Sequence, residues 1–114
     1  HDVVHQVGHA SSLVAGMATG DMGLIARSLD DVIVEPARAP LVPFLKDAER
    51  AAVSAGAFAS FLGGSGPCIA AFFDRREADG LVIAKAVQDF YEGHGVECFC
   101  WNTTWGAGCE RVMQ

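Results

Sequence analysis

Basic residues are scarce in this chain, with eight Lys and Arg against 14 Asp and Glu and a formal net charge of −6. They are scattered rather than clustered, so the chain lacks the positive patch that nucleic-acid binding requires. No apolar run approaches the roughly 20 residues that span a bilayer, and no basic segment precedes a short apolar core, as in a signal peptide. These absences predict a cytoplasmic protein that binds a small molecule and contacts neither nucleic acid nor membrane.

Cysteine pairs with the Cys-x-x-Cys spacing of zinc and redox sites are also missing. The four cysteines are Cys68, Cys98, Cys100 and Cys109. We interpret them as reduced thiols of the core, without a metal or disulfide role. Cys98 and Cys100 alternate along an expected strand, which would place both on one face.

What the chain does contain is enough apolar sequence for one core: 51% of its 114 residues are hydrophobic. We therefore expect residues 1–114 to form a single domain. The sequence opens on His1 rather than Met and enters a helical pattern at once. From this we expect the chain to be the later part of a longer protein.

Four helices are predicted from apolar residues that recur at three- and four-residue spacing. The first helix ends at Thr19-Gly20, and the second runs from Met22 to about Asp30 with Asp21 as its N-cap. The third runs from Pro43 to Gly56. The fourth is a long helix that begins after Asp74 and Glu77, which have capping-box spacing, and ends at Gly93 and Gly95. The face of the first helix that we expect to be buried consists of Val3, Val7, Ala10, Val14 and Met17. The buried face of the third helix consists of Leu45, Ala48, Ala52 and Ala55, and we expect the lysine and the acidic residues of this helix to face water. Pro36 disfavours helix at Glu35, so residues 32–36 are expected to be an extended or irregular link.

A glycine-rich run separates two short apolar runs at residues 57–62 and 68–73. The run reads Gly63-Gly64-Ser65-Gly66-Pro67. Glycines permit positive φ and close approach to the main chain, so the segment is either a ligand-binding loop between two strands or only a hairpin turn. Residues 96–101 alternate like a strand, and residues 108–112 add a short final one. Together these elements predict an α+β fold, a two-layer sandwich of helices on a mostly antiparallel sheet.

Three histidines, His1, His5 and His9, fall on one helix face at a spacing that can hold a transition metal. Asp2 is the only acidic neighbour in the sequence near them. We therefore expect no metal site at this position.

Three segments taken in order resemble the C-terminal half of the homoserine kinases, a branch of the GHMP kinases. They are Asp31-Val32-Ile33-Val34-Glu35-Pro36-Ala37-Arg38, Leu41-Val42-Pro43 and the glycine-rich run. The resemblance covers essentially the whole chain. It implies a ferredoxin-like C-terminal domain of an enzyme that phosphorylates the hydroxyl of L-homoserine with ATP, giving O-phosphohomoserine for threonine biosynthesis.

The resemblance also implies roles for individual residues. Arg38 would hold the α-carboxylate of homoserine with two parallel hydrogen bonds, although without the resemblance it reads as a solvated arginine. Glu35 would orient Arg38 or meet the substrate ammonium, unless it is a plain surface charge. His9 would line the substrate cleft. Gly63, Gly64, Ser65 and Gly66 would shape the place where the γ-phosphoryl group meets the hydroxyl, with backbone N–H groups donating to anionic oxygens.

The sequence departs from these kinases in lacking their Pro-x-x-x-Gly-Leu-Gly-Ser-Ser loop, which wraps the ATP phosphates. ATP and Mg²⁺ would therefore be bound mainly by an N-terminal domain absent from this chain, and the chain alone would be inactive. An upstream strand and a further substrate arginine of the family are missing as well. Surface that normally meets such a domain would favour self-association, with a homodimer as the simplest product.

Two alternatives remain open at this stage. The first is the C-terminal domain of another GHMP kinase, acting on mevalonate, a sugar or a diphosphocytidyl substrate. The second is a non-catalytic α+β module for ligand binding or dimerisation, in which the glycine-rich run is only a turn. We assign no catalytic residue to this chain under any of these hypotheses.

Overall fold

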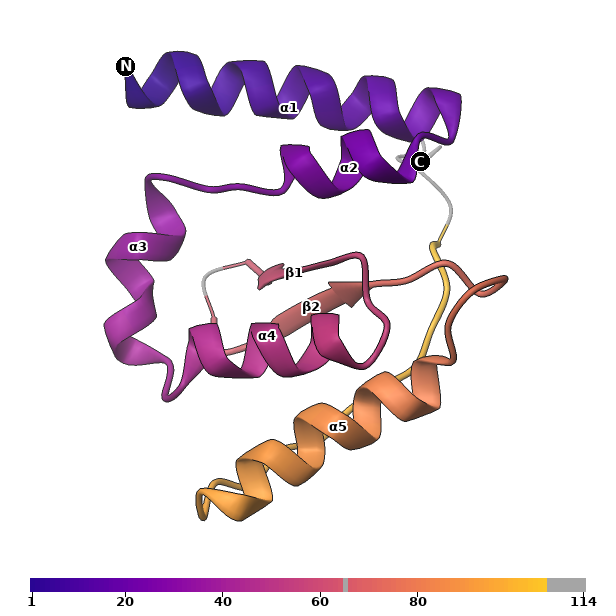
Figure 1. Cartoon of the computed structure of the whole chain (residues 1–114). Helices are drawn as coiled ribbons and strands as arrows, with labels where there is room; N and C mark the ends of the chain where they lie inside the picture. Colours follow the sequence, from indigo (N-terminus) through magenta and orange to yellow (C-terminus); the bar gives the residue numbers. More distant parts are fainter. Residues whose placement is uncertain (65, 107–114) are drawn as a thin grey trace, which may run out of the picture.

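The computed structural model describes residues 1–64 and 66–106. Its elements are α1 (Asp2–Thr19), α2 (Met22–Ser28), α3 (Val34–Arg38), the 3₁₀ turn η1 (Ala39–Leu41), α4 (Leu45–Ser54), β1 (Ala59–Leu62), β2 (Ile69–Phe72) and α5 (Gly80–Gly93). The two strands form an antiparallel hairpin in which Ser60 lies opposite Ala71. α4 packs on this hairpin and α5 packs on α4 (Figure 1). The predicted α+β arrangement of helices on an antiparallel sheet is confirmed.

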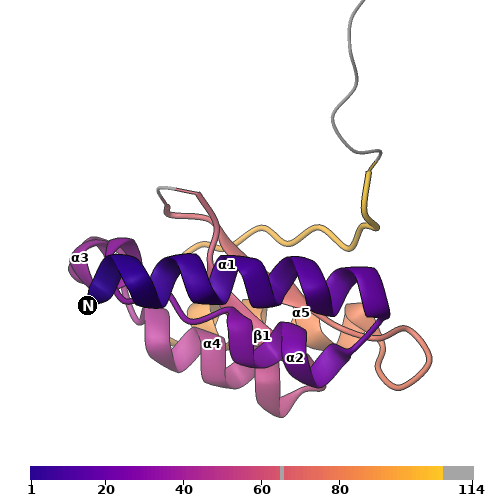
Figure 2. The ribbon, with the colours of Figure 1, turned by 90° about the horizontal axis from the view of Figure 1, so that it is seen from above.

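α1 and α2 form a helical hairpin, and they lie side by side in both views (Figure 2). α1 ends at Gly20, which has φ 71°, and the Asp21 side chain then accepts a hydrogen bond from the Leu24 N–H at 3.0 Å. Both boundaries were predicted. The helices meet at Gly16, where a Cβ atom would come within 2.9 Å of Ile25 Cγ1. A residue without a side chain therefore sets this close approach.

The apolar stripe predicted to be buried on α1 is exposed, so that prediction is wrong for the described part of the chain. Val3, Val7 and Val14 are each more than 60% exposed. The side of α1 that turns toward the rest of the domain instead carries Gly16 and the partly buried polar residue Gln6. Apolar periodicity identified the helix, but the close approach at Gly16 determines which face α2 meets.

α3 occupies much of the stretch predicted to be an extended link, and this prediction is also wrong. The Asp31 carboxylate accepts hydrogen bonds from the backbone N–H groups of Ile33, Val34 and Glu35 at 2.9–3.0 Å. These bonds satisfy the N–H groups that open a helix. Pro36 lies within the first turn, where a missing N–H leaves no helical bond unmade.

α4 begins two residues later than predicted because Phe44 adopts a left-handed conformation, with φ 57°. Leu45, Ala48 and Ala52 are buried as expected. Glu49, predicted to face water, is only 7% exposed, so this part of the prediction is wrong. Two apolar clusters form the core: Val42, Leu45 and Leu62, and Ala52, Ala57 and Ile83.

The cap of α5 differs from the predicted one. Asp79 accepts a hydrogen bond from the Leu81 N–H at 2.9 Å, whereas Asp74 pairs with Arg76 and belongs to the preceding turn. α5 ends at Gly93 as predicted. Among the described helices none combines the length and hydropathy needed to cross a membrane.

Residues 96–101 run back along α5 and form no strand, contrary to prediction (Figure 1). They are held by side chains instead of a backbone ladder, since Gln88 Nε2 donates to the Cys98 carbonyl at 3.1 Å. Their alternation is still visible, because the sulfur atoms of Cys98 and Cys100 lie 3.8 Å apart on one side. Cys68, Cys98 and Cys100 are free thiols, but Cys68 is exposed because it lies at the turn of the hairpin, so its prediction as a core residue is wrong. Cys109 and the strand predicted at 108–112 lie outside the described residues.

Candidate functional site

A cavity of about 210 Å³ opens between α1, the segment after α2 and the hairpin. It is lined by Gln6, His9, Ala10, Ser28, Leu29, Asp30, Asp31, Glu35, Phe61 and Leu62. The fold thus brings together two of the predicted substrate residues, His9 and Glu35, from separate helices. The volume is below the roughly 300 Å³ at which pockets for drug-sized ligands begin, and it suits a small metabolite.

Gln6 lines this cavity and forms hydrogen bonds to the residues just before α3. Its Nε2 donates to Asp31 Oδ1 at 3.0 Å, and its Oε1 accepts from the Val32 N–H at 3.1 Å. Burial raises the pKa of Asp31, but the hydrogen bonds from Ile33, Val34, Glu35 and Gln6 outweigh it and hold this pKa below its ordinary value. Asp31 therefore acts as a charged acceptor. Sequence reasoning missed Gln6, because its partners are distant in the sequence.

Glu35 is a buried carboxylate that ties three elements together. Its Oε2 accepts from the Leu62 N–H of β1 at 2.9 Å, and its Oε1 accepts from Lys46 of α4. Burial raises the pKa of Glu35, but these two hydrogen bonds and the charge of Lys46 together hold it below its ordinary value. The burial of Glu35 contradicts the reading as a plain surface charge. Its contacts with Leu62 and Lys46 position the α3 segment, a role that the sequence did not predict.

Glu49 shares Lys46 with Glu35, and the same lysine therefore serves two buried carboxylates. Lys46 Nζ lies 3.1 Å from Glu49 Oε1, while Glu49 Oε2 is buried without a hydrogen-bond partner among the described residues. Burial raises the pKa of Glu49, the negative charge of Glu35 adds to this, and Lys46 only partly opposes it. The ionised form of Glu49 is thus disfavoured in the folded protein.

We predict that Glu49→Gln stabilises the protein near pH 7. A carboxyl group with a raised pKa stabilises the fold most below its ordinary pKa, and that contribution is lost as the pH rises through the raised value. Glutamine stays neutral, so the melting temperature of the variant should exceed that of the wild type at pH 7.5, and the two should converge near pH 4. The exposed Glu92→Gln serves as the matched control. A variant that melts below the wild type at pH 7.5 would contradict this prediction.

Neither Arg38 nor the described residues of the glycine-rich loop are among the residues that line the cavity. Arg38 ends α3 one turn beyond Glu35 and is exposed, and its side chain forms no hydrogen bond or ion pair with any described residue. The loop follows directly after Leu62, which lines the cavity. It is closed by the Gly63 N–H donating to the Cys68 carbonyl at 2.8 Å, and Gly64 has φ 62°. Ser65 lies outside the described residues.

Comparison with known proteins gives one consistent result. The family model described as "GHMP kinases C terminal" matches residues 13–93. The homoserine kinase of Chloroherpeton thalassium is 47% identical over 88 residues, which cover 77% of this chain and 27% of that protein. That of Pyrobaculum islandicum is 39% identical over 111 residues, which cover 96% of this chain and 37% of that protein.

A solved structure agrees with these sequence relatives. The crystal structure of homoserine kinase from Cytophaga hutchinsonii matches with a TM-score of 0.73 and 38% identity, over 82% of this chain and 29% of that one. The chain therefore spans between about a quarter and somewhat more than a third of the length of these relatives.

Proposed function

This chain belongs to the GHMP kinase C-terminal family, and on that premise we propose that it is the substrate-binding part of a homoserine kinase. The complete enzyme would transfer the γ-phosphoryl group of ATP to the hydroxyl of L-homoserine, giving O-phosphohomoserine for threonine biosynthesis. The proposal places the enzyme in the cytoplasm, with a homodimer as its expected assembly. It is supported by the relatives of that name and by the arrangement of the α3 segment at the cavity.

The observation that carries the proposal is the geometry of α3. Glu35 is fixed by Leu62 and Lys46, and Arg38 stands on the same helix one turn further on with its guanidinium unpaired among the described residues. A planar guanidinium matches a carboxylate with two parallel hydrogen bonds. We assign Arg38 to the α-carboxylate of homoserine and His9 to the wall of the cavity. Glu35 is assigned to holding α3 against the base of the glycine-rich loop.

The loop supplies the other half of the acceptor site. Gly64 and Gly66 both have positive φ, which gives the main chain a tight turn. The Gly63 N–H donates to the Cys68 carbonyl and the Gly66 N–H donates to the Gly63 carbonyl, so among the described residues of the loop the Gly64 N–H is the backbone donor left for a ligand. We propose that the Gly64 N–H donates to an oxygen of the incoming phosphoryl group. Phosphoryl transfer depends mainly on such positioning, which is why α3 and the loop need a common anchor.

The described residues do not fit a site for Mg²⁺ and ATP. Their only group of three or more metal-ligating side chains contains two imidazoles and one carboxylate, whereas Mg²⁺ prefers oxygen ligands. The phosphate-wrapping loop of the family is also missing from the sequence. The role that we propose for this chain is therefore limited to the acceptor side of the reaction.

The proposal is tested by ADP release from the complete protein with Mg-ATP and, in turn, L-homoserine, mevalonate and galactose. We expect turnover with L-homoserine alone. Turnover with mevalonate or galactose instead would assign the protein to another GHMP kinase. If the folded protein turned over none of the three acceptors, the chain would be a binding module and the proposal would fail.

A further inference from the structure

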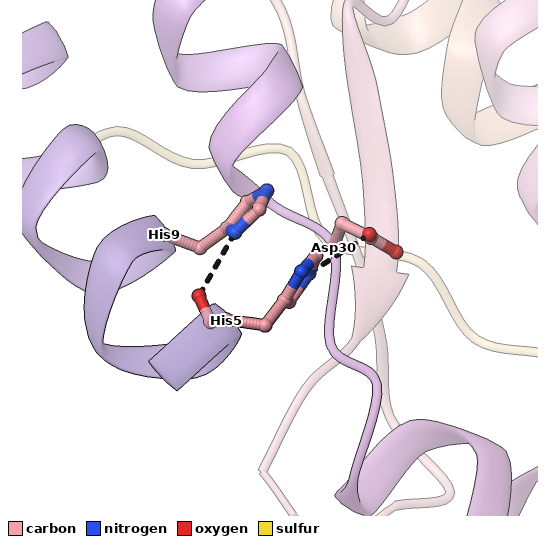
Figure 3. A group of neighbouring side chains, drawn as sticks. All are labelled: His5, His9 and Asp30. Atoms are coloured by element: carbon pink, nitrogen blue, oxygen red, sulfur yellow. Dashed lines mark hydrogen bonds and ion pairs between the residues drawn. The ribbon is translucent and has the colours of Figure 1, made fainter. Parts of the chain in front are cut away.

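Two histidines and an aspartate lie close together (Figure 3), and two of them, His9 and Asp30, line the cavity. His5 and His9 lie one turn apart on α1, and Asp30 follows α2. His5 Nε2 is 3.2 Å from Asp30 Oδ2, and the two imidazole rings are stacked with centroids 3.9 Å apart. One ligand atom from each residue lies within 4.8 Å of the other two.

We propose that His5, His9 and Asp30 form a binding site for a divalent transition-metal ion such as Zn²⁺. Tetrahedral Zn²⁺ with bonds of about 2.0–2.1 Å sets its ligand atoms about 3.3 Å apart, which the 3.2 Å separation of His5 and Asp30 already matches. Two histidines at i and i+4 on one helix face are a recurrent zinc-binding pair. All three side chains are at least partly exposed, so rotation can close the longer separations.

The hydrogen bond of His9 identifies its ligand atom. His9 Nδ1 lies 3.0 Å from the backbone carbonyl oxygen of His5, which can only accept a hydrogen bond. The ring proton is therefore on Nδ1, and the Nε2 lone pair is free for a metal. Metal-ligating histidines usually donate their other ring N–H in this way.

The donor set selects the class of ion. Imidazole suits Zn²⁺, Cu²⁺ and Ni²⁺, whereas Mg²⁺ and Ca²⁺ prefer sites made of oxygen alone. The sequence had argued against a metal because only Asp2 lies near the histidines in the chain. In the folded protein the acidic residue next to the histidines is Asp30, which lies 25 positions from His5 in the sequence.

A metal at this position would have two consequences. Asp30 follows α2 and both histidines belong to α1, so the ion would cross-link the helical hairpin and stabilise it. His9 and Asp30 also line the cavity, so the ion would stand in the cavity wall with a fourth position for water or a carboxylate ligand. The proposal does not depend on the proposed kinase activity.

The test is titration of the chelator-treated complete protein with Zn²⁺ by calorimetry, and with Co²⁺ by visible absorption, without nucleotide or homoserine. Conservative variants His9→Gln and Asp30→Asn should each weaken the affinity by at least about tenfold, the lower end of the loss seen when a supporting residue of a metal site is removed. The control variants His94→Gln and Asp47→Asn, both exposed residues outside the cluster, should leave it unchanged. Asp30 is exposed, so Asp30→Asn should fold even if a histidine variant does not.

Three outcomes would overturn the proposal. One is no bound Zn²⁺, and another is equal affinity in the wild type, His9→Gln and Asp30→Asn. The third is loss of binding in Cys98→Ser/Cys100→Ser but not in Asp30→Asn, which would assign the ion to the two thiols whose sulfurs lie 3.8 Å apart. Because no substrate is present, each outcome is independent of whether the protein phosphorylates homoserine.

Discussion

Replacing Glu35 with alanine is expected to lower the free energy of unfolding by about 3 kcal/mol, the sum of an orphaned buried donor and a lost charge-assisted hydrogen bond. The Leu62 N–H, which donates to Glu35 Oε2 at 2.9 Å, would lose its partner in a buried environment. The bond from Lys46 would be lost too, but at smaller cost because the lysine side chain is 62% exposed. Urea denaturation of wild type and variant measures the difference.

Glu35→Gln separates the two contributions. The amide oxygen can still accept from Leu62, so we expect a loss of about 1 kcal/mol, close to the contribution of one hydrogen bond. The control is Glu77→Ala, an exposed glutamate that should change stability by less than about 0.5 kcal/mol. Hydrogen exchange at the Leu62 amide gives a local readout, with faster exchange expected in Glu35→Ala than in Glu35→Gln. Unchanged protection in Glu35→Ala would show that the carboxylate does not anchor β1.

Glu35 also links the two parts of the acceptor site that we propose. Leu62 is the last residue of β1, directly before the glycine-rich loop, and Glu35 is one turn before Arg38. A single carboxylate therefore ties the helix that carries the Arg38 guanidinium to the strand that leads into the glycine-rich loop. We expect Glu35 variants to impair turnover as well as stability, without any contact between Glu35 and substrate.

The features predictable from sequence are those that depend on near neighbours. Asp21 caps α2 because its side chain reaches an N–H three residues on, and Gly20 ends α1 because left-handed backbone favours glycine. The hairpin followed from two apolar runs around a glycine-rich turn. In each case the interacting groups lie within a few residues of one another, so the local sequence is enough to predict the structure.

The predictions from sequence are wrong where a residue distant in the sequence determines the local structure. Glu35 reads as a surface charge because Leu62, which buries it, is 27 positions away. Residues 96–101 alternate like a strand, but alternation specifies extended backbone and not a neighbouring strand to pair with. The α1 stripe was assigned to the wrong face because Gly16, and not the apolar residues, determines where α2 packs. The candidate site depends on such long-range contacts more than the helices do.

Arg38→Ala is expected to reduce kcat/KM for L-homoserine by about 100-fold, since a charge-assisted hydrogen bond contributes about 1.5–3 kcal/mol and each 1.4 kcal/mol is a factor of ten. We expect most of the loss in KM, because a group that holds the carboxylate binds substrate and transition state alike. Arg38→Lys keeps the charge but loses the planar fork, so an intermediate loss of about tenfold is expected. Steady-state kinetics on the complete protein measure both, with the exposed Arg75→Ala as control.

A substrate without the carboxylate isolates the role of Arg38. If the guanidinium acts only on that group, 3-aminopropan-1-ol should be a poor acceptor for the wild type and an equally poor one for Arg38→Ala. The Arg38 side chain forms no hydrogen bond or ion pair with the described residues, so its truncation should leave the unfolding midpoint unchanged. The kinetic loss could then not be attributed to misfolding. A 100-fold loss with both acceptors would instead mean that Arg38 acts on the phosphoryl group or on the fold of the site. The contrast between the two acceptors thus decides whether α3 recognises an amino acid.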